Sequence, residues 1–342
     1  MNEHDHALVI GISRYADADD PSRWISNLRG PDNDAEAMAE WLRRADGGGL
    51  PHGNVRLIRS ADERDPSKPQ QSSLVTALDE ITDLPLVTPK GYAGRRLYIY
   101  ACGHGMARAR REAALISAEA QRENQLNVLL PSWIDWCYEA ARFEELVLWF
   151  DGCATRRPTA IFKACVKDPL FAAGAAEGHV FQVYAAGVDQ KAVEREIDGT
   201  WHGVFTYALL QGLKGAAGQV VDTGSLRKYL QNTMRAYMDD DQRVPSVAKE
   251  PNFGHTDDIT FATYPEPRRY PVTLVFPGTC AGQEATIGVK KSRPAIARKV
   301  LVGTTWKLDL AVGVYAALVP GLDLAMPFEV IGRGTHADIT LR

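Results

Sequence analysis

The first two-thirds of the chain alternates between short apolar runs and longer stretches in which apolar residues recur at helical spacing. Residues 7–12 are almost wholly apolar, which is typical of a strand buried on both faces of a sheet. After them, Asp32, Asn33 and Asp34 offer helix-capping side chains ahead of a periodic apolar series over residues 35–42. The sequence therefore predicts a buried strand followed by a helix at its start.

The same alternation continues to about residue 240. Further strands are predicted at residues 55–58, 97–101, 146–150 and 180–185, and helices at residues 74–81, 133–142, 204–213 and 225–238. Strands that alternate with helices form mostly parallel sheets with helices on both faces. We therefore expect an α/β domain whose reactive groups gather at the carboxyl ends of its strands.

The pattern changes after residues 264–267, where Pro265 and Pro267 restrict the backbone as a linker would. Beyond them, apolar runs separated by Gly or Pro occur at residues 272–276, 285–289, 300–301, 306–310, 315–319, 328–331 and 338–341. Short runs of this kind predict a small all-β sandwich. We therefore expect two domains, residues 1–264 and residues 268–342. The second has no convergent polar cluster, which favours a module that binds a protein partner.

Charge limits the classes of partner. A net charge of −4 provides no broad basic field for nucleic acid or anionic lipid. The basic run at residues 108–111 is short and more typical of a solvated loop.

No apolar run reaches the roughly 18 residues that a membrane span needs, and residues 1–6 are too polar for a signal peptide. We therefore expect a cytoplasmic protein with no nucleic-acid partner and no membrane span.

The chain has five cysteines, Cys102, Cys137, Cys153, Cys165 and Cys280. Their number is odd and no pair has C-x-x-C spacing, so the pattern indicates neither a disulfide framework nor a zinc site. Acidic clusters at residues 17–20 and 239–241 offer calcium ligands, but neither has the spacing of an EF-hand loop. We expect reduced thiols and no cofactor, with calcium as the alternative.

Two predicted strands end in residues that can do chemistry. Residues 97–101 run into Cys102, Gly103, His104 and Gly105, and residues 146–150 run into Asp151, Gly152 and Cys153. Both groups follow strands that could be neighbours in the sheet, and glycines let the backbone approach a substrate closely. The carboxyl ends of these two strands are therefore the candidate site.

A cysteine nucleophile needs a base that raises its thiolate fraction and later protonates the leaving amine. His104 is the candidate base for Cys153, and the backbone N–H groups of Gly105 and Cys153 are the candidate oxyanion donors. A lone cysteine at the end of a buried strand is more often an inert small hydrophobe, and a lone histidine in such a turn is more often structural. The hypothesis therefore depends on the pair.

His104 and Cys153 are 49 residues apart, close to the roughly 50 residues between the caspase histidine and cysteine. Residues 7–15, 28–35, 98–105, 151–153, 185–194 and 203–210 resemble the successive signatures of the caspase and metacaspase peptidase clan, above all its bacterial metacaspase-like branch. The resemblance covers about residues 6–263. It implies a cysteine endopeptidase, a caspase-like three-layer sandwich with a mostly parallel six-stranded sheet, and no organic cofactor.

The resemblance also implies a substrate preference. Asp34 and Asp151 match metacaspase positions whose carboxylates hold a basic substrate side chain; Asp189 is a third candidate, and Cys102 replaces the usual serine in the pocket. A buried carboxylate costs free energy unless it is hydrogen-bonded or meets a cation, and a substrate guanidinium is such a partner. We therefore expect cleavage of protein substrates after Arg or Lys. For Asp34, a role as helix N-cap is the alternative.

Some features keep other interpretations open. The residues after Cys153 are Ala154, Thr155 and Arg156, whereas the family usually has His-Ser-Gly or Arg-Gly there. A pocket selective for Asp would need converging arginines, and Arg156 is the basic residue near the cysteine in sequence. The second functional hypothesis is an inactive caspase-like scaffold that recruits partners through its β domain. Retention of His104 and Cys153 favours the protease, which the resemblance alone places in a bacterial stress or defence pathway.

Overall fold

The computed structural model describes residues 3–20, 24–107, 113–167, 178–234, 248, 251–288, 295–330 and 337–341. The chain forms two compact units, Met1–Leu210 with Asp222–Ala262, and Gln211–Val221 with Thr263–Arg342. The main part of the second unit begins at Thr263, beside the proline-containing linker. Gln211–Val221 also belongs to the second unit, whereas the sequence pattern placed it in the first domain. The basic run at 108–111 and the acidic cluster at 239–241 lie outside the described residues.

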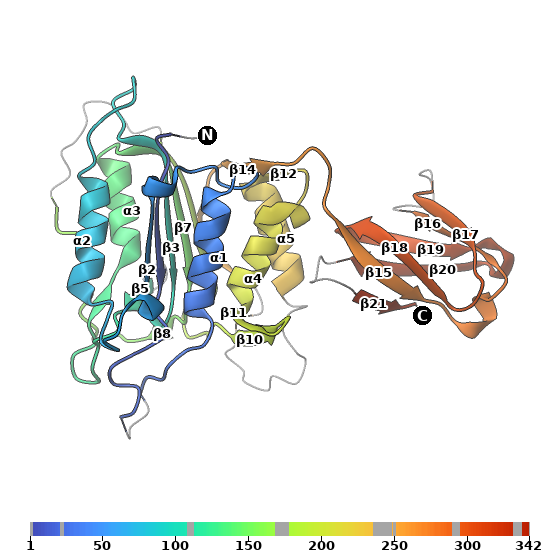
Figure 1. The fold of residues 1–342 in the computed structure, drawn as a ribbon, viewed down its shortest axis with the longest axis horizontal. Coiled ribbons are helices and arrows are strands. Elements are labelled where there is room, and N and C mark those ends of the chain that lie inside the picture. Colours follow the sequence, from blue (N-terminus) through green and yellow to red (C-terminus); the bar gives the residue numbers. More distant parts are fainter. Residues whose placement is uncertain are drawn as a thin grey trace. The chain divides into compact units, whose positions relative to one another are not determined.

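A six-stranded sheet forms the centre of the first unit (Figure 1). In spatial order its strands are β13 (Asn252–Thr256), β9 (His179–Tyr184), β7 (Phe143–Asp151), β3 (Gly94–Cys102), β1 (His6–Gly11) and β2 (Val55–Arg59). The edge strand β13 is antiparallel to β9, and every other neighbouring pair is parallel. The predicted mostly parallel six-stranded sheet is therefore confirmed.

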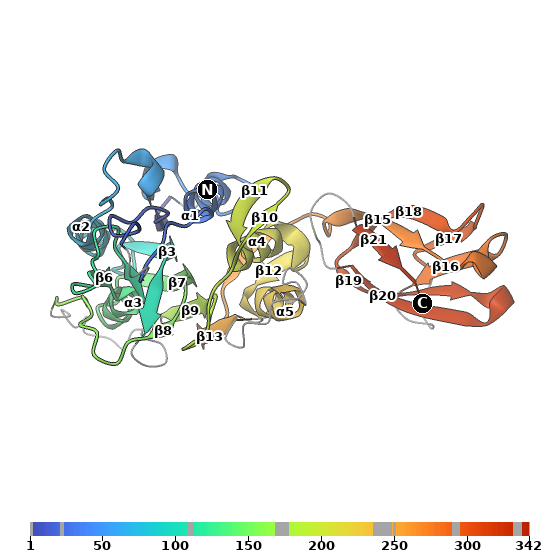
Figure 2. The same ribbon diagram turned by 90° about the horizontal axis from the view of Figure 1, so that it is seen from below.

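Helices cover both faces of this sheet (Figures 1 and 2). On one face lie α2 (Gln71–Thr82) and α3 (Leu130–Glu139), and on the other α1 (Pro31–Arg43), α4 (Val204–Gln211) and α5 (Thr223–Thr233). The predicted helices are present with shifted ends, and residues 235–238 of the last one lie outside the described part. No described helix is long and apolar enough to cross a membrane.

The central strands are apolar on both faces because helices bury both faces. On β3, Leu97 and Ile99 belong to the core that α2 and α3 cover. The intervening Tyr98 packs against Trp41 of α1 and Trp149 of β7, with ring centroids 6.5 and 5.5 Å away. This two-sided burial explains why the sequence shows continuous apolar runs there in place of alternation.

Helix α1 begins one turn earlier than its apolar periodicity suggests. Pro31 is its first residue, and the preceding Gly30 makes no side-chain cap. Proline suits this position because its fixed φ matches the helix and its missing N–H would have no partner there. Asp34 is therefore the fourth helical residue, and the N-cap interpretation of Asp34 is wrong.

Smaller strands surround the carboxyl end of the sheet. β6 (Asn127–Val128), β5 (Ala113–Ile116), β4 (Gly105–Ala107) and β8 (Thr155–Arg156) form one small sheet, and β10 (Glu194–Ile197) and β11 (Thr200–Gly203) form a hairpin. β4 begins directly after His104, and β8 begins two residues after Cys153. Because β4 pairs with β8, the two turns that carry these residues are held by a second set of backbone hydrogen bonds.

The remaining short elements are β12 (Val220–Asp222) and β14 (Thr260–Thr263), 3₁₀ turns at His52–Asn54, Ser60–Asp62, Gly278–Cys280 and Pro320–Leu322, and a π-helical turn at Gly212–Ala216. The two strands lie where the chain passes from one unit to the other.

After the linker, the described residues of the second unit form two β-sheets. One has the order β18 (Thr305–Ala311), β15 (Arg269–Val275), β21 (Ala337–Thr340), and the other β17 (Ala297–Val300), β16 (Glu284–Gly288), β19 (Gly313–Val319), β20 (Leu324–Val330). Burial alternates along β19 and β20, and the rings of Tyr315 and Phe328 stack 5.6 Å apart. Alternation of this kind is expected where each sheet buries one face.

Candidate active site

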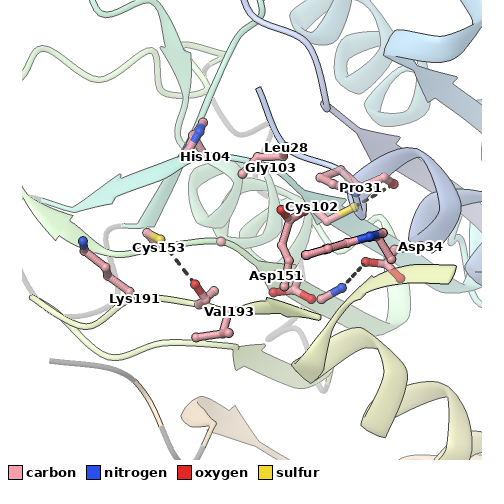
Figure 3. Close-up of a pocket in the computed structure, with 15 residues that line it drawn as sticks. Leu28, Pro31, Asp34, Cys102, Gly103, His104, Asp151, Cys153, Lys191 and Val193 are labelled. Atoms are coloured by element: carbon pink, nitrogen blue, oxygen red, sulfur yellow. Dashed lines mark hydrogen bonds between the residues drawn. The ribbon is translucent and has the colours of Figure 1, made fainter. Parts of the chain in front are cut away.

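The carboxyl ends of β3 and β7 meet at one edge of the central sheet. Cys102, the last residue of β3, is in register with Asp151, the last residue of β7. The N–H of Gly103 donates to the carbonyl oxygen of Asp151 at 3.1 Å. His104 and Cys153 each lie two residues beyond this pair, and both line one cavity of about 330 Å³ (Figure 3).

Four parts of the first unit supply the walls of this cavity. They are Leu28, Pro31 and Asp34 around the start of α1, residues 102–104 and 151–153 at the ends of β3 and β7, residues 191–194, and Trp201 and Gly203 of β11. The site therefore combines strand ends with a hairpin and a helix that are distant in sequence.

Two neighbours hold the imidazole of His104. The ring nitrogen Nε2 lies 2.8 Å from the carbonyl oxygen of Ser26, and the ring packs against Tyr15 with centroids 4.9 Å apart. Burial lowers the pKa of His104, and the Ser26 carbonyl opposes that shift. An Nε2–H donated to Ser26 leaves Nδ1 of the neutral ring as the acceptor. The ring is therefore suited to receive a proton at Nδ1.

The turn before His104 needs glycine. Gly103 has φ of 152°, and a Cβ atom there would lie 2.8 Å from the hydroxyl of Tyr15. That hydroxyl in turn accepts the backbone N–H of His104 at 2.7 Å. Tyr15 thus positions both the backbone and the ring of the histidine, a role that its place in the sequence does not reveal.

Cys153 is half-buried, and its thiol donates to the carbonyl oxygen of Ala192 at 3.9 Å. Burial raises the pKa of this thiol, while the Ala192 bond and the charge of Lys191 act in the opposite direction. A raised pKa keeps the thiol protonated at neutral pH, so a nucleophilic role for Cys153 would require a base. Cys102 and Cys137 are fully buried, and burial raises their pKa values as well.

Gly105, the predicted oxyanion donor beside Cys153, begins β4. A Cβ atom at Gly105 would collide with the carbonyl oxygen of Cys153, so the two backbones approach closely. The cavity lining includes Gly103 and Gly152 and does not include Gly105. The oxyanion role of Gly105 and Cys153 remains a prediction.

Asp151 lies in the wall of the same cavity and is buried. Thr206 donates to its carboxylate from the backbone N–H at 3.1 Å and from the hydroxyl at 2.6 Å. Burial and the nearby charge of Asp34 raise the pKa of Asp151 to about 7, against the lowering effect of the Thr206 bonds. A Cβ atom at position 203 would collide with the Asp151 carboxylate, so a larger residue there would displace that side chain.

Asp34 reaches the cavity from the first turns of α1. Its carboxylate accepts the backbone N–H of Gly203 at 2.7 Å and lies 2.7 Å from Nδ1 of His202. Burial raises the pKa of Asp34 to about 6, and the bonds to His202 and Gly203 limit that rise. The two carboxylates predicted to form the pocket are therefore brought together.

Glu194 is a third carboxylate in the lining, at the start of β10. It accepts the backbone N–H of Gly30 at 2.7 Å and that of Arg29 at 3.1 Å. The guanidinium of Arg29 lies 3.9 Å from the ring centroid of Trp201. Sequence reasoning assigned no role to Glu194, although the segment 185–194 that it ends was part of the resemblance.

Of the other two residues predicted for the pocket, Cys102 lies in the cavity wall and Asp189 lies outside it. Cys102 lines the cavity, and its thiol donates to the carbonyl oxygen of Pro31 at 3.2 Å. Asp189 does not line the cavity; its carboxylate accepts the backbone N–H of Arg156 at 3.1 Å, and its own N–H donates to Ala154 at 2.9 Å. The structure therefore does not bring Asp189 to the other carboxylates. Arg156, the residue considered for an Asp-selective pocket, is also outside the lining.

Within the described residues, no group of three or more His, Cys, Asp or Glu side chains is arranged to hold a metal ion. In the acidic cluster at residues 17–20, the Asp17 carboxylate already accepts hydrogen bonds from Trp24 and from the backbone N–H of Arg122. The proposal of a calcium site therefore gains no support from this cluster, and residues 239–241 lie outside the described part.

No protein-family model matches the chain. Over 271 residues the chain is 28% identical to a protein of a Desulfuromonadales bacterium that is named a probable protease. The match covers 72% of this chain and 32% of the relative, so the chain spans about a third of that protein's length. A protein of Geobacter sulfurreducens with a known crystal structure aligns over 77% of this chain and 98% of its own, with 13% identity and a TM-score of 0.45.

Proposed function

We propose that this protein is a cysteine endopeptidase of the caspase clan that cleaves after Arg or Lys. One observation carries the proposal: His104 and Cys153 line the same cavity as the buried carboxylates of Asp34 and Asp151. The relative named a probable protease supports the peptidase class. The cysteine type, the clan and the basic preference come from the site residues and from the resemblance of their motifs.

In the proposed reaction, Nδ1 of His104 takes the thiol proton of Cys153 as the sulfur attacks the scissile carbonyl carbon. The carbonyl oxygen becomes an oxyanion, which the N–H groups of Cys153 and Gly105 stabilise. The C–N bond then breaks, and the imidazolium gives its proton to the leaving amine. Water hydrolyses the thioester with His104 as base, which restores the thiol and releases the new carboxyl terminus.

The carbonyl oxygen of Ser26 serves this reaction by position. It holds Nε2–H of His104 and so keeps Nδ1 available to the thiol. The Ser26 carbonyl also stabilises the imidazolium that forms during attack, since its oxygen carries partial negative charge. A backbone carbonyl thus does for this histidine what a third side chain does in a catalytic triad.

The carboxylates of Asp34 and Asp151 supply the proposed preference for a basic residue. Both are buried, and burial disfavours their charged forms and so raises their pKa values. A guanidinium or ammonium group that enters the cavity would offset this cost and form charge-assisted hydrogen bonds. Substrate binding and carboxylate ionisation are therefore expected to favour each other.

The most direct test is covalent labelling by a peptide electrophile with Arg at its reactive end. We expect one adduct per chain, located on Cys153 by peptide mass spectrometry, and no adduct in the Cys153→Ala variant. Equal labelling of the variant would reject Cys153 as the nucleophile. An intact, folded protein that binds partners but neither labels nor cleaves would favour the scaffold hypothesis.

The preference for Arg is expected to weaken as the pH falls through the range of about 7 to about 6. Below its pKa a carboxyl group is protonated and neutral, so Asp151 and Asp34 lose over this range the charge that would pair with a guanidinium. The measurement is the ratio of kcat/KM for two peptides that differ only in Arg or citrulline at the cleaved residue, from about pH 5 to about pH 8. Ionisation of His104 and Cys153 affects both peptides and cancels in this ratio. A ratio that stays constant over this range would contradict the assignment.

The second unit is expected to be dispensable for cleavage of short peptides, because every residue of the cavity lining belongs to the first unit. A chain of residues 1–265 should keep kcat/KM within about threefold of the full chain, as a compact unit with its own core can. The truncated chain separates Gln211–Val221 from most of the unit it groups with, so its folding must be checked by circular dichroism. A soluble, folded chain of residues 1–265 without activity would contradict this prediction.

A further inference from the structure

The charged groups of the cavity are not evenly distributed. Asp34, Asp151 and Glu194 contribute carboxylates, and Lys191 is the single lysine or arginine among the described residues of the lining. In Figure 3, Lys191 lies on the side of Cys153 away from Asp34 and Asp151. The cavity thus has an acidic end and a basic end, with the nucleophile between them.

The segment 191–194 connects these two ends. The carbonyl oxygen of Ala192 accepts the Cys153 thiol at 3.9 Å, and the carboxylate of Glu194 accepts the N–H of Gly30 at 2.7 Å. Three residues of extended chain span at most about 10 Å. Lys191 is therefore one residue from the contact with the thiol, and its Cα atom lies at most about 10 Å from that of Glu194.

The ammonium group of Lys191 is open to a ligand. Lys191 is exposed, and within the described part of the chain no hydrogen bond or ion pair engages its side chain. Its positive charge nevertheless acts on the site, since it lowers the pKa of the Cys153 thiol against the effect of burial. An exposed cation beside the reacting atom and away from the acidic end is suited to a negative group of the substrate.

We propose that Lys191 binds the carboxylate of an Asp or Glu residue directly beside the basic residue of the substrate. This inference rests on the proposed function. It narrows the substrate class to sequences in which an acidic residue lies immediately before the basic residue or immediately after it, across the cleaved bond. A second basic residue at the same place would meet Lys191 and be disfavoured. Dibasic sequences are therefore poor substrates.

The size of the effect follows from the exposure of Lys191. Exposed ion pairs change binding by up to about fivefold, and salt screens them. We therefore expect peptides with Glu beside Arg to have kcat/KM up to about fivefold above that of otherwise identical peptides with Gln, at low ionic strength. The preference should shrink as salt is added.

The test uses the full chain and four peptides with one Arg, carrying Glu or Gln at the position before it or at the position after it. The variants are Lys191→Met, Lys191→Arg and Lys191→Glu, with Lys228→Met, an exposed lysine of α5, as matched control. We expect a Glu preference at one of the two positions in the wild type and in the Lys228→Met control. The preference should vanish in Lys191→Met, persist in Lys191→Arg and reverse in Lys191→Glu.

Three outcomes would overturn the inference or its basis, and they can be told apart. If Lys191→Met leaves both kcat/KM and the Glu/Gln ratio unchanged, Lys191 has no role in recognition. If kcat/KM of Lys191→Met falls by the same factor for all four peptides, so that the ratio is again unchanged, Lys191 acts in activation of the thiol and not in recognition. Absence of cleavage of every Arg peptide by the wild type, or cleavage by Cys153→Ala, would overturn the proposed function itself.

Discussion

Replacement of Cys153 by alanine is expected to abolish peptide cleavage, with kcat/KM falling by roughly 10⁴-fold or more. The substitution removes the atom that would form the acyl bond and changes little else, because Cys153 is half-buried and its thiol makes one weak contact with Ala192. The unfolding temperature should therefore shift by less than about 4 °C. Both quantities can be measured on the full chain with an Arg peptide and by calorimetry.

Cys165→Ala is the matched control for this substitution. Cys165 is also half-buried and carries a free thiol, but it does not line the cavity. We expect Cys165→Ala to retain full activity. Substantial turnover by Cys153→Ala, or its loss in Cys165→Ala, would place the nucleophile elsewhere.

His104→Ala should lose as much activity as Cys153→Ala, since a nucleophile and its base act as one unit. For the same reason, the double variant should be no less active than either single variant. Losses that simply multiply in the double variant would show that the two residues do not act together.

Asp151→Asn is expected to remove most of the preference for a basic residue. Asparagine keeps the shape and an oxygen that accepts the bonds from Thr206, but it carries no charge. Loss of one charge from a buried ion pair, here between Asp151 and the substrate guanidinium, is expected to lower kcat/KM for an Arg peptide by roughly 10²-fold. The corresponding citrulline peptide should change far less, so the ratio of the two peptides measures the lost charge.

Asp189→Asn is the control for Asp151→Asn. Its carboxylate holds the backbone of Arg156 outside the cavity lining, so we expect the Arg preference to remain. Faster cleavage of an Asp peptide than of an Arg peptide by the wild type would reject the acidic pocket altogether. A loss of Arg preference in Asp189→Asn equal to that in Asp151→Asn would show that Asp189 also belongs to the pocket.

Local patterns in the sequence predicted the elements that carry the site. Residues 97–101 and 146–150 are apolar throughout because both faces of β3 and β7 are buried, and such runs are visible without tertiary contacts. Each run is followed by a glycine-containing turn that carries a reactive side chain, His104 after the first run and Cys153 after the second. Strand ends of this kind point to a site because neighbouring parallel strands bring their carboxyl ends to one edge.

Other parts of the site have no local signature. Asp34 resembled a helix cap in sequence, yet Pro31 begins the helix and the carboxylate bonds His202 and Gly203 of the β10–β11 hairpin. Nothing near His202 in sequence indicates this partner, because the two residues are 168 positions apart. Ser26 and Tyr15 were missed in the same way, since their roles depend on where a loop crosses the end of β3.

The sequence by itself determined the alternation of strands and helices and the change of pattern near residue 265, and it proposed His104, Cys153, Asp34 and Asp151 as site residues. Each of these depends on residues close together in the chain, so periodicity and residue type suffice. Only the tertiary structure decided which carboxylates share the cavity, that Asp189 stays outside it, and that Lys191 lies on the side of Cys153 away from Asp34 and Asp151. Those facts depend on how distant segments pack around one sheet edge, and a linear pattern of apolar and polar residues does not encode such distances.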